Sequence, residues 1–260
     1  MKRNAWLGGL VALVLVPGAG CGVTQPLAAY KDTMLSSILA PGSITTTPTP
    51  PGRYLLFLSL GRANCDSLTS DVVATVNGDS NVSFAAGGCV PSGASGPMFT
   101  YELEAGDSRD ATIVLTDGKD RMQVQVENLL AGYQLQPRKA GFDPSLNFQE
   151  GANPVARGEV LLFDRIPNVR AAASLEANMS QEHMVGTGSD ARREWTNHDV
   201  HPALMGDAAV QVTIPTEVNA GEASLSVLTS EHPTIRLCEG VASCEAQVTY
   251  GMETTVTILP

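Results

Sequence analysis

The chain has 260 residues, a formal net charge of −11 at pH 7 and an aromatic content of only 5%. Its acidity disfavours nucleic acid and anionic lipid headgroups as partners that are held by charge, because like charges repel. The scarcity of aromatic residues leaves little material for a stacked platform that binds sugars or nucleic-acid bases.

The first residues have the layout of a secretory signal peptide. Lys2 and Arg3 supply positive charge at the start, and an uncharged apolar stretch follows from Ala5 to Val16. This stretch is too short to cross a bilayer as a helix, whereas its length and flanks match the apolar region of a signal peptide. We therefore expect residues 1–20 to be removed on export.

The signal peptide ends in the sequence PGAGCG at residues 17–22. This segment resembles the lipobox of bacterial lipoproteins, in which the peptidase cuts just before a cysteine that carries a diacylglycerol on its sulfur. Ala19 and Gly20 match the small residues of the motif, and Gly18 stands where the family usually has an aliphatic residue. The resemblance implies that Cys21 carries fatty acyl chains such as palmitate, and two chains suffice for stable membrane anchoring. The residue after the cysteine is Gly22. In the enteric sorting pattern of such lipoproteins, the absence of Asp at this position favours the outer membrane or the cell surface.

Residues 21–52 are expected to form a lipidated tether. Leu27, Tyr30, Met34 and Ile38 recur at a spacing that predicts a short helix. The Pro- and Thr-rich segment 40–52 then favours an extended, semi-rigid spacer, because proline prevents regular backbone hydrogen bonding.

From Arg53 the hydrophobic pattern changes to a period of two, which predicts strands with one buried face. The expected strands of a first module, residues 53–132, are 54–60, 71–76, 81–86, 98–104, 111–116 and 121–127. The Asp117-Gly118 pair between the last two predicts a hairpin. Short strands separated by Gly, Asp and Asn turns are typical of an all-β protein with immunoglobulin-like β-sandwich modules.

A second set of strands predicts a second β-sandwich module at residues 158–260. Its expected strands are 159–163, 171–177, 208–214, 223–229, 234–238 and a stretch within 244–259. Residues 133–157 would form the linker between the modules, since they contain three prolines. One larger sandwich or barrel is the alternative.

The chain has five cysteines, so one of them cannot pair within the molecule. If Cys21 carries lipid, an even set remains, as disulfide bonding in an exported protein requires. Four cysteines allow three pairings, and the simplest choice joins Cys65 to Cys89 and Cys238 to Cys244. Zinc is the competing use, but these cysteines lack the short spacing of zinc ligands.

The segment WTNHDVHP, residues 195–202, is the candidate for metal chemistry. On a helical turn His198 and His201 would share a face and, with Glu182 or His183 nearby, could bind zinc or another divalent metal. The alternative is that these are loop histidines that cap or pack between strands.

No catalytic motif stands out in the chain. The pattern Gly-x-Ser-x-Gly of serine hydrolases does not occur, and no cofactor motif is complete. The sequence therefore predicts a membrane-anchored envelope lipoprotein, not an enzyme, with a binding or structural-assembly role toward an envelope protein or glycan. A metal-binding protein or metal-dependent enzyme centred on His198 and His201 is the alternative.

Overall fold

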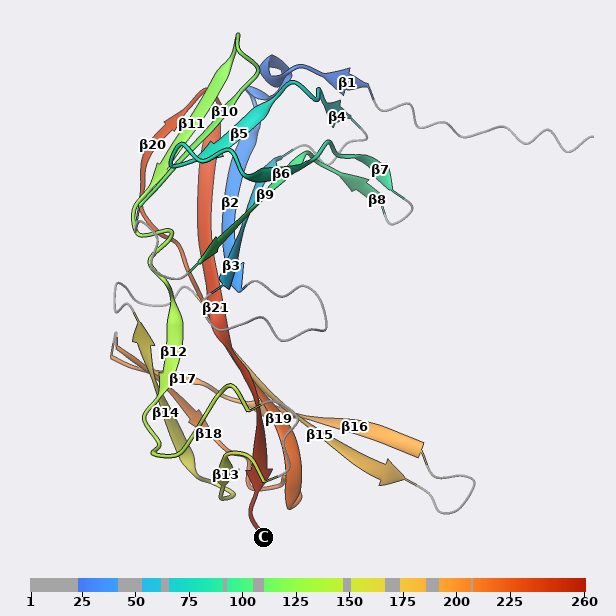
Figure 1. Cartoon of the computed structure of the whole chain (residues 1–260). Coiled ribbons are helices and arrows are strands. Elements are labelled where there is room, and N and C mark those ends of the chain that lie inside the picture. Colours follow the sequence, from blue (N-terminus) through green and yellow to red (C-terminus); the bar gives the residue numbers. More distant parts are fainter. Residues whose placement is uncertain are drawn as a thin grey trace, which may run out of the picture.

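The computed structural model describes residues 23–41, 53–61, 66–90, 93–104, 110–146, 151–166, 174–185, 192–206 and 208–260. Within these residues the regular elements are β-strands, apart from the short 3-10 helix η1 at Leu27–Tyr30. The predicted all-β fold is therefore confirmed (Figure 1). The predicted signal peptide, Cys21 and Cys65 lie outside the described residues. No helix in the described part is long and apolar enough to cross a membrane.

The largest sheet has nine strands and runs through the length of the molecule (Figure 1). Eight strands follow the order β16 (Arg192–Val200), β15 (Ser174–Val185), β19 (Gly221–Glu231), β21 (Ser243–Ile258), β2 (Met34–Pro41), β3 (Arg53–Leu60), β9 (Met98–Glu104) and β6 (Val82–Ala85). The ninth, β13 (Pro154–Val155), pairs with the end of β21. β2 and β13 lie parallel to β21, and the other pairs in this sheet are antiparallel.

Two four-stranded sheets complete the two lobes of the molecule. The upper lobe in Figure 1 contains β20 (Ile235–Glu239), β11 (Arg121–Val126), β10 (Ala111–Thr116) and β5 (Val73–Val76). The lower lobe contains β12 (Gln134–Pro137), β14 (Val160–Ile166), β18 (Ala209–Thr213) and β17 (Ala203–Met205). Two small sheets pair β1 (Thr24–Gln25) with β4 (Ser67–Leu68) and β7 (Gly88–Val90) with β8 (Gly93–Ser95).

The strand β21 joins the lobes. Its first part pairs with β2 from Ser243 to Val248, and its later part pairs with β19 from Val248 to Ile258. Gly251 lies in the later part, where a Cβ atom would come within 2.1 Å of the Val227 carbonyl oxygen. Glycine is therefore required at this position, because any side chain would push β21 away from β19.

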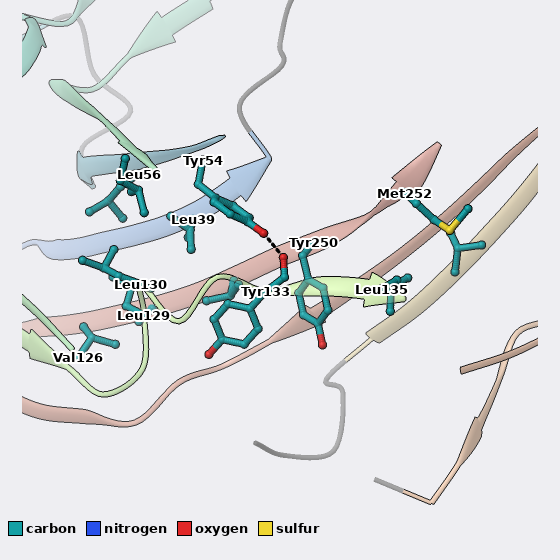
Figure 2. Packing of buried hydrophobic residues seen from close by; sticks show 14 of the residues in the cluster. Leu39, Tyr54, Leu56, Val126, Leu129, Leu130, Tyr133, Leu135, Tyr250 and Met252 are labelled. Carbon is teal, nitrogen blue, oxygen red and sulfur yellow. Dashed lines mark hydrogen bonds between the residues drawn. The ribbon is translucent and has the colours of Figure 1, made fainter. Parts of the chain in front are cut away.

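The buried apolar side chains of both lobes form one continuous cluster. Figure 2 shows this cluster around Tyr133 and Tyr250, with Leu39 and Leu56 on one side and Met252 on the other. The Tyr133 and Tyr250 rings are tilted, with centroids 5.1 Å apart. The core therefore continues between the lobes, so they share one hydrophobic interior.

The β10–β11 hairpin confirms the pairing that the sequence predicts. Buried residues alternate along both strands, as period-two patterning requires. At the turn the Asp117 carboxylate accepts hydrogen bonds from the backbone N–H groups of Lys119 and Asp120, at 2.9 and 2.8 Å. Gly118 adopts a positive φ of 84°, which explains the Asp-Gly pair.

The predicted tether and its helix are wrong for residues 34–41. These residues form β2, which lies between β3 and β21 inside the large sheet. Pairing on both edges outweighs the helical spacing of Leu27, Tyr30, Met34 and Ile38, since tertiary contacts override weak local preferences. The Pro- and Thr-rich residues that follow connect two neighbouring strands, and 42–52 lie outside the described residues.

The predicted module boundaries do not match the boundaries of the sheets. β20 and the first part of β21, from the predicted second module, pair with β11 and with β2. The predicted linker contributes β12 and β13, which pair with β14 and β21. The predicted boundaries are wrong because strands that lie far apart in the sequence pair with each other to complete each lobe. Such pairing leaves no local pattern in the sequence.

Two predicted strand pairs are also absent from the described residues. The Asn77-Gly78 turn predicts a hairpin of the strands at 71–76 and 81–86, and the five residues between Cys238 and Cys244 predict a hairpin of β20 with β21. Instead β5 pairs with β10 and β6 with β9, in different sheets. Each short connection thus crosses between the two layers of the upper lobe, as in a sandwich, where the sequence suggested a hairpin.

Candidate functional site

A long hairpin that projects from the lower lobe forms the candidate site. β15 and β16 pair in antiparallel register from Ala177 opposite Val200 to Val185 opposite Arg192. β16 is the terminal strand of the large sheet, and among the described residues it pairs with β15 alone. Figure 1 shows the hairpin extending away from the body of the molecule. The outer edge of β16 therefore presents backbone N–H and C=O groups that have no neighbouring strand.

The base of the hairpin is anchored, whereas its outer half is a two-stranded ribbon. β15 pairs with β19 through Ser174–Ser180 only, so residues 181–185 have β16 as their one strand neighbour in the described part. At the base Met179 is fully buried, and the side-chain amide of Gln181 donates to the Asn219 carbonyl at 3.0 Å. Two-stranded hairpins are marginally stable alone, so these contacts hold the ribbon in place.

One face of the ribbon carries large exposed apolar side chains. Trp195 in β16 and Met184 in β15 are each 61% exposed. Glu182 lies opposite Trp195, and Arg193 lies opposite Met184. Opposite residues of an antiparallel pair share a face, so all four side chains stand on one side. Trp, Met and Arg are the residue types that protein interfaces favour.

Each face of the ribbon carries one ion pair of the outer half of the hairpin. Arg193 Nε lies 3.1 Å from Glu182 Oε1, and Arg192 Nη2 lies 2.6 Å from Glu194 Oε1. Both arginine side chains are 75% exposed, so these pairs contribute little to stability. Their side chains can therefore exchange partners when another charged surface approaches.

The segment that was expected to bind metal is the end of a strand. His198 lies in β16 opposite Met179, and His201 follows the strand as an exposed residue. Side chains alternate along a strand, so a separation of three residues does not place two histidines on one face. Among the described residues no group of three or more His, Cys, Asp and Glu side chains is placed to hold a metal ion. His198 Nε2 is buried, and no described residue provides it with a hydrogen-bond partner.

A second polar cluster lies buried where the two lobes meet. Arg165 on β14 pairs with Glu231 at the end of β19, with side chains 0% and 4% exposed. Arg165 Nε donates to the Tyr250 hydroxyl at 3.1 Å, and this hydroxyl donates to Glu231 at 2.6 Å. Burial raises the pKa of Tyr250 well above its ordinary value, and the hydrogen bond to Glu231 acts in the same direction. Each charged group is paired, so the cluster ties β14 of the four-stranded sheet to β19 and β21 of the large sheet and offers no free reactive group.

The late cysteine pair has the geometry of a disulfide. The Sγ atoms of Cys238 and Cys244 are 2.07 Å apart and their Cα atoms 5.9 Å apart, as the predicted pairing requires. Because β20 and β21 belong to different sheets, this bond ties the two layers of the upper lobe together. The pairing of Cys65 with Cys89 stays a prediction, since Cys65 lies outside the described residues.

Sequence reasoning singled out the segment of Trp195, His198 and His201 but missed the strand that contains it. In β16 only Val200 is buried, so no period-two alternation of apolar residues marks the strand. The one available indication was the start of β15, where Leu175, Ala177 and Met179 alternate with polar residues.

Comparison with known proteins adds no family assignment. No protein-family model matches the chain, and no curated protein matches it in sequence. Among solved structures, it is similar at 16% identity to a Bacteroides ovatus protein, SGBP-B of a mixed-linkage glucan utilization locus, in complex with a heptasaccharide. The match covers 86% of this chain and 45% of that chain, with a TM-score of 0.22. This chain thus spans less than half of that protein, and a similarity at this level carries no argument about function.

Proposed function

We propose that this protein is a lipid-anchored, non-catalytic protein of the bacterial outer envelope that binds another envelope component through the β15–β16 hairpin. The observation that carries the proposal is the free edge of β16 beside Trp195 and Met184, each 61% exposed. An unpaired strand edge supplies backbone hydrogen bonds, and exposed apolar side chains supply area that binding removes from water.

The anchor rests on the lipobox-like segment that ends in Cys21 and Gly22. Export and lipidation would place the folded chain at the outer membrane or the cell surface. The pairing of Cys238 with Cys244 fits this location, because disulfides persist in oxidising compartments.

The hairpin favours a protein partner over a glycan. A row of backbone donors and acceptors along β16 is matched by another extended strand, which adds to the sheet edge. Trp195 would pack on the side chains of the added strand, and the flanking arginines and glutamates would choose partners by charge.

Chemical cross-linking on intact cells tests the proposal. The double variant Trp195→Ala/Met184→Ala should lose the cross-linked species that the wild-type protein forms, because it removes the exposed apolar centre. Val160→Ala is the matched control, since Val160 also lies on the lower lobe and is 49% exposed. Mass spectrometry of the cross-linked species would separate a protein partner from a glycan. An unchanged pattern in the double variant would contradict a binding role for the hairpin.

A further inference from the structure

We propose that the strand which pairs with the free edge of β16 is β16 of a second copy of this chain. This inference rests on the proposed function, since it names the partner of the same hairpin. Two copies related by a two-fold axis would join their large sheets edge to edge, which is the isologous arrangement of most homodimers.

The length of β16 sets it apart from the other strands that end a sheet. β16 has nine residues, whereas the remaining end strands of the larger sheets, β5, β6, β12, β17 and β20, have between three and five. Proteins protect sheet edges from pairing by keeping end strands short or by placing proline or lysine in them. The sequence RREWTNHDV of β16 contains neither residue. Of these devices β16 thus has none, and its charged residues can protect the edge only against strands whose charges do not match.

Two copies of β16 that pair in antiparallel orientation have complementary charges. If two copies pair in antiparallel register with Thr196 on the axis, Arg193 faces Asp199 of the second copy. In the same register Glu194 faces His198. Each match occurs twice by symmetry, so opposite charges or hydrogen-bonding groups meet on both faces of the new sheet.

Neighbouring registers lose these matches. In an antiparallel pair, the side chains of two facing residues lie on the same side of the sheet. The two-fold axis must therefore pass through a residue and not between two residues, so the neighbouring registers are those centred on Trp195 and on Asn197. With Trp195 on the axis, Arg193 would face Asn197 and Arg192 would face His198. With Asn197 on the axis, Trp195 would face Asp199. Charge therefore selects the register that is centred on Thr196.

The same register covers the apolar centre of the ribbon. Trp195 would lie opposite Asn197 and diagonal to Trp195 of the second copy, a separation that large aromatic side chains span. The two indole rings and the nearby Met184 side chains would then leave water together. The Glu194 carboxylate of the second copy would also face the strand position of His198, whose buried Nε2 has no partner among the described residues.

Cysteine cross-linking of the full-length protein on intact cells tests the register. Thr196→Cys places two thiols on the axis, where facing Cα atoms lie about 4.5–5.5 Å apart, within the range of a disulfide. Mild oxidation should convert most of this variant to a dimer on non-reducing gels. Asn197→Cys is the control, because its copies are offset by two positions along the strand. The parent chain sets the background from its own cysteines.

A charge swap in the Thr196→Cys background tests the pairing itself. Asp199→Arg and Arg193→Asp should each lower the dimer fraction several-fold, because like charges would then face each other. The combination of both changes should restore it, which a merely structural role of either residue would not do.

The outcomes separate this inference from the proposed function. Absence of a Thr196→Cys dimer, or equal dimer from Asn197→Cys, would overturn self-pairing. If Trp195→Ala/Met184→Ala still abolished a cross-link to a different molecule, the binding role of the hairpin would stand with another partner. If neither experiment showed an effect, both proposals would fail.

Discussion

Arg165, Glu231 and Tyr250 place charged and polar groups where apolar side chains fill the rest of the interface between the lobes. Replacing Arg165 with Met would leave the Glu231 carboxylate buried without its cation, at a cost of about 3–5 kcal/mol in the free energy of unfolding. Urea unfolding measures this loss. The double variant Arg165→Met/Glu231→Leu should recover most of it, because an apolar pair of similar volume removes the unpaired charge.

Arg138→Met is the control for this experiment. Arg138 pairs with Asp164 beside Arg165, but the two side chains are 47% and 40% exposed. Water screens exposed pairs, so this change should move the urea midpoint far less. Equal midpoints for the Arg138 and Arg165 variants would contradict the structural role of the buried pair.

Single residues differ in how far the sequence predicts their environment. Met122, Val124 and Val126 alternate with polar residues, and all three are buried as that pattern predicts. The burial of Arg165 could not be predicted, because its partner Glu231 lies 66 residues away. The sequence singles out His198 and His201, but the metal chemistry inferred from them requires a helical turn that β16 does not form.

Among the elements, the connection between β20 and β21 carries a testable bond. Cys238 and Cys244 close a loop of five residues between two sheets. The loop-entropy model assigns this closure about 2.4 kcal/mol, so Cys238→Ser/Cys244→Ser should lower the free energy of unfolding by roughly that amount.

Non-reducing peptide mapping of the exported protein should find Cys238 joined to Cys244 and Cys65 joined to Cys89. Free thiols at 238 and 244 would contradict the bond.

Elements with one buried face were predictable, and elements defined by distant partners were not. The β10–β11 hairpin follows from alternation and a local turn. β2 carries apolar spacing that fits a helix and becomes a strand because β21, about 200 residues later, supplies its parallel neighbour. β16 has exposed residues on both faces, so its sequence lacks the period on which strand prediction depends.

At the scale of the whole molecule, β21 makes the lobes interdependent. It pairs with β2 in the upper lobe and with β19 in the lower lobe, and the core is continuous between them. The C-terminal strand must therefore be present before either lobe is complete. The sequence predicted two sandwich-like bodies, but their shared strand emerges only from three-dimensional pairing.

The position of Cys21 relates this architecture to the membrane. β1 begins at Thr24, three residues after Cys21, so a lipid on this cysteine would hold the upper lobe close to the bilayer. Figure 1 shows the β15–β16 hairpin on the other lobe, away from β1. Anchoring at Cys21 would thus place the β15–β16 hairpin on the lobe farther from the membrane surface, where a partner can reach it.

The variant Cys21→Ala tests this anchor. It removes the only sulfur at the lipobox-like segment, so the protein should remain uncut or become soluble, and it should not incorporate labelled palmitate. Cell fractionation and intact mass measure both outcomes. Cys244→Ala is the control, because it removes a cysteine of the disulfide and should keep the lipid and the membrane location. If Cys21→Ala stayed with membranes at the processed wild-type mass, the protein would not be a lipoprotein anchored at this residue.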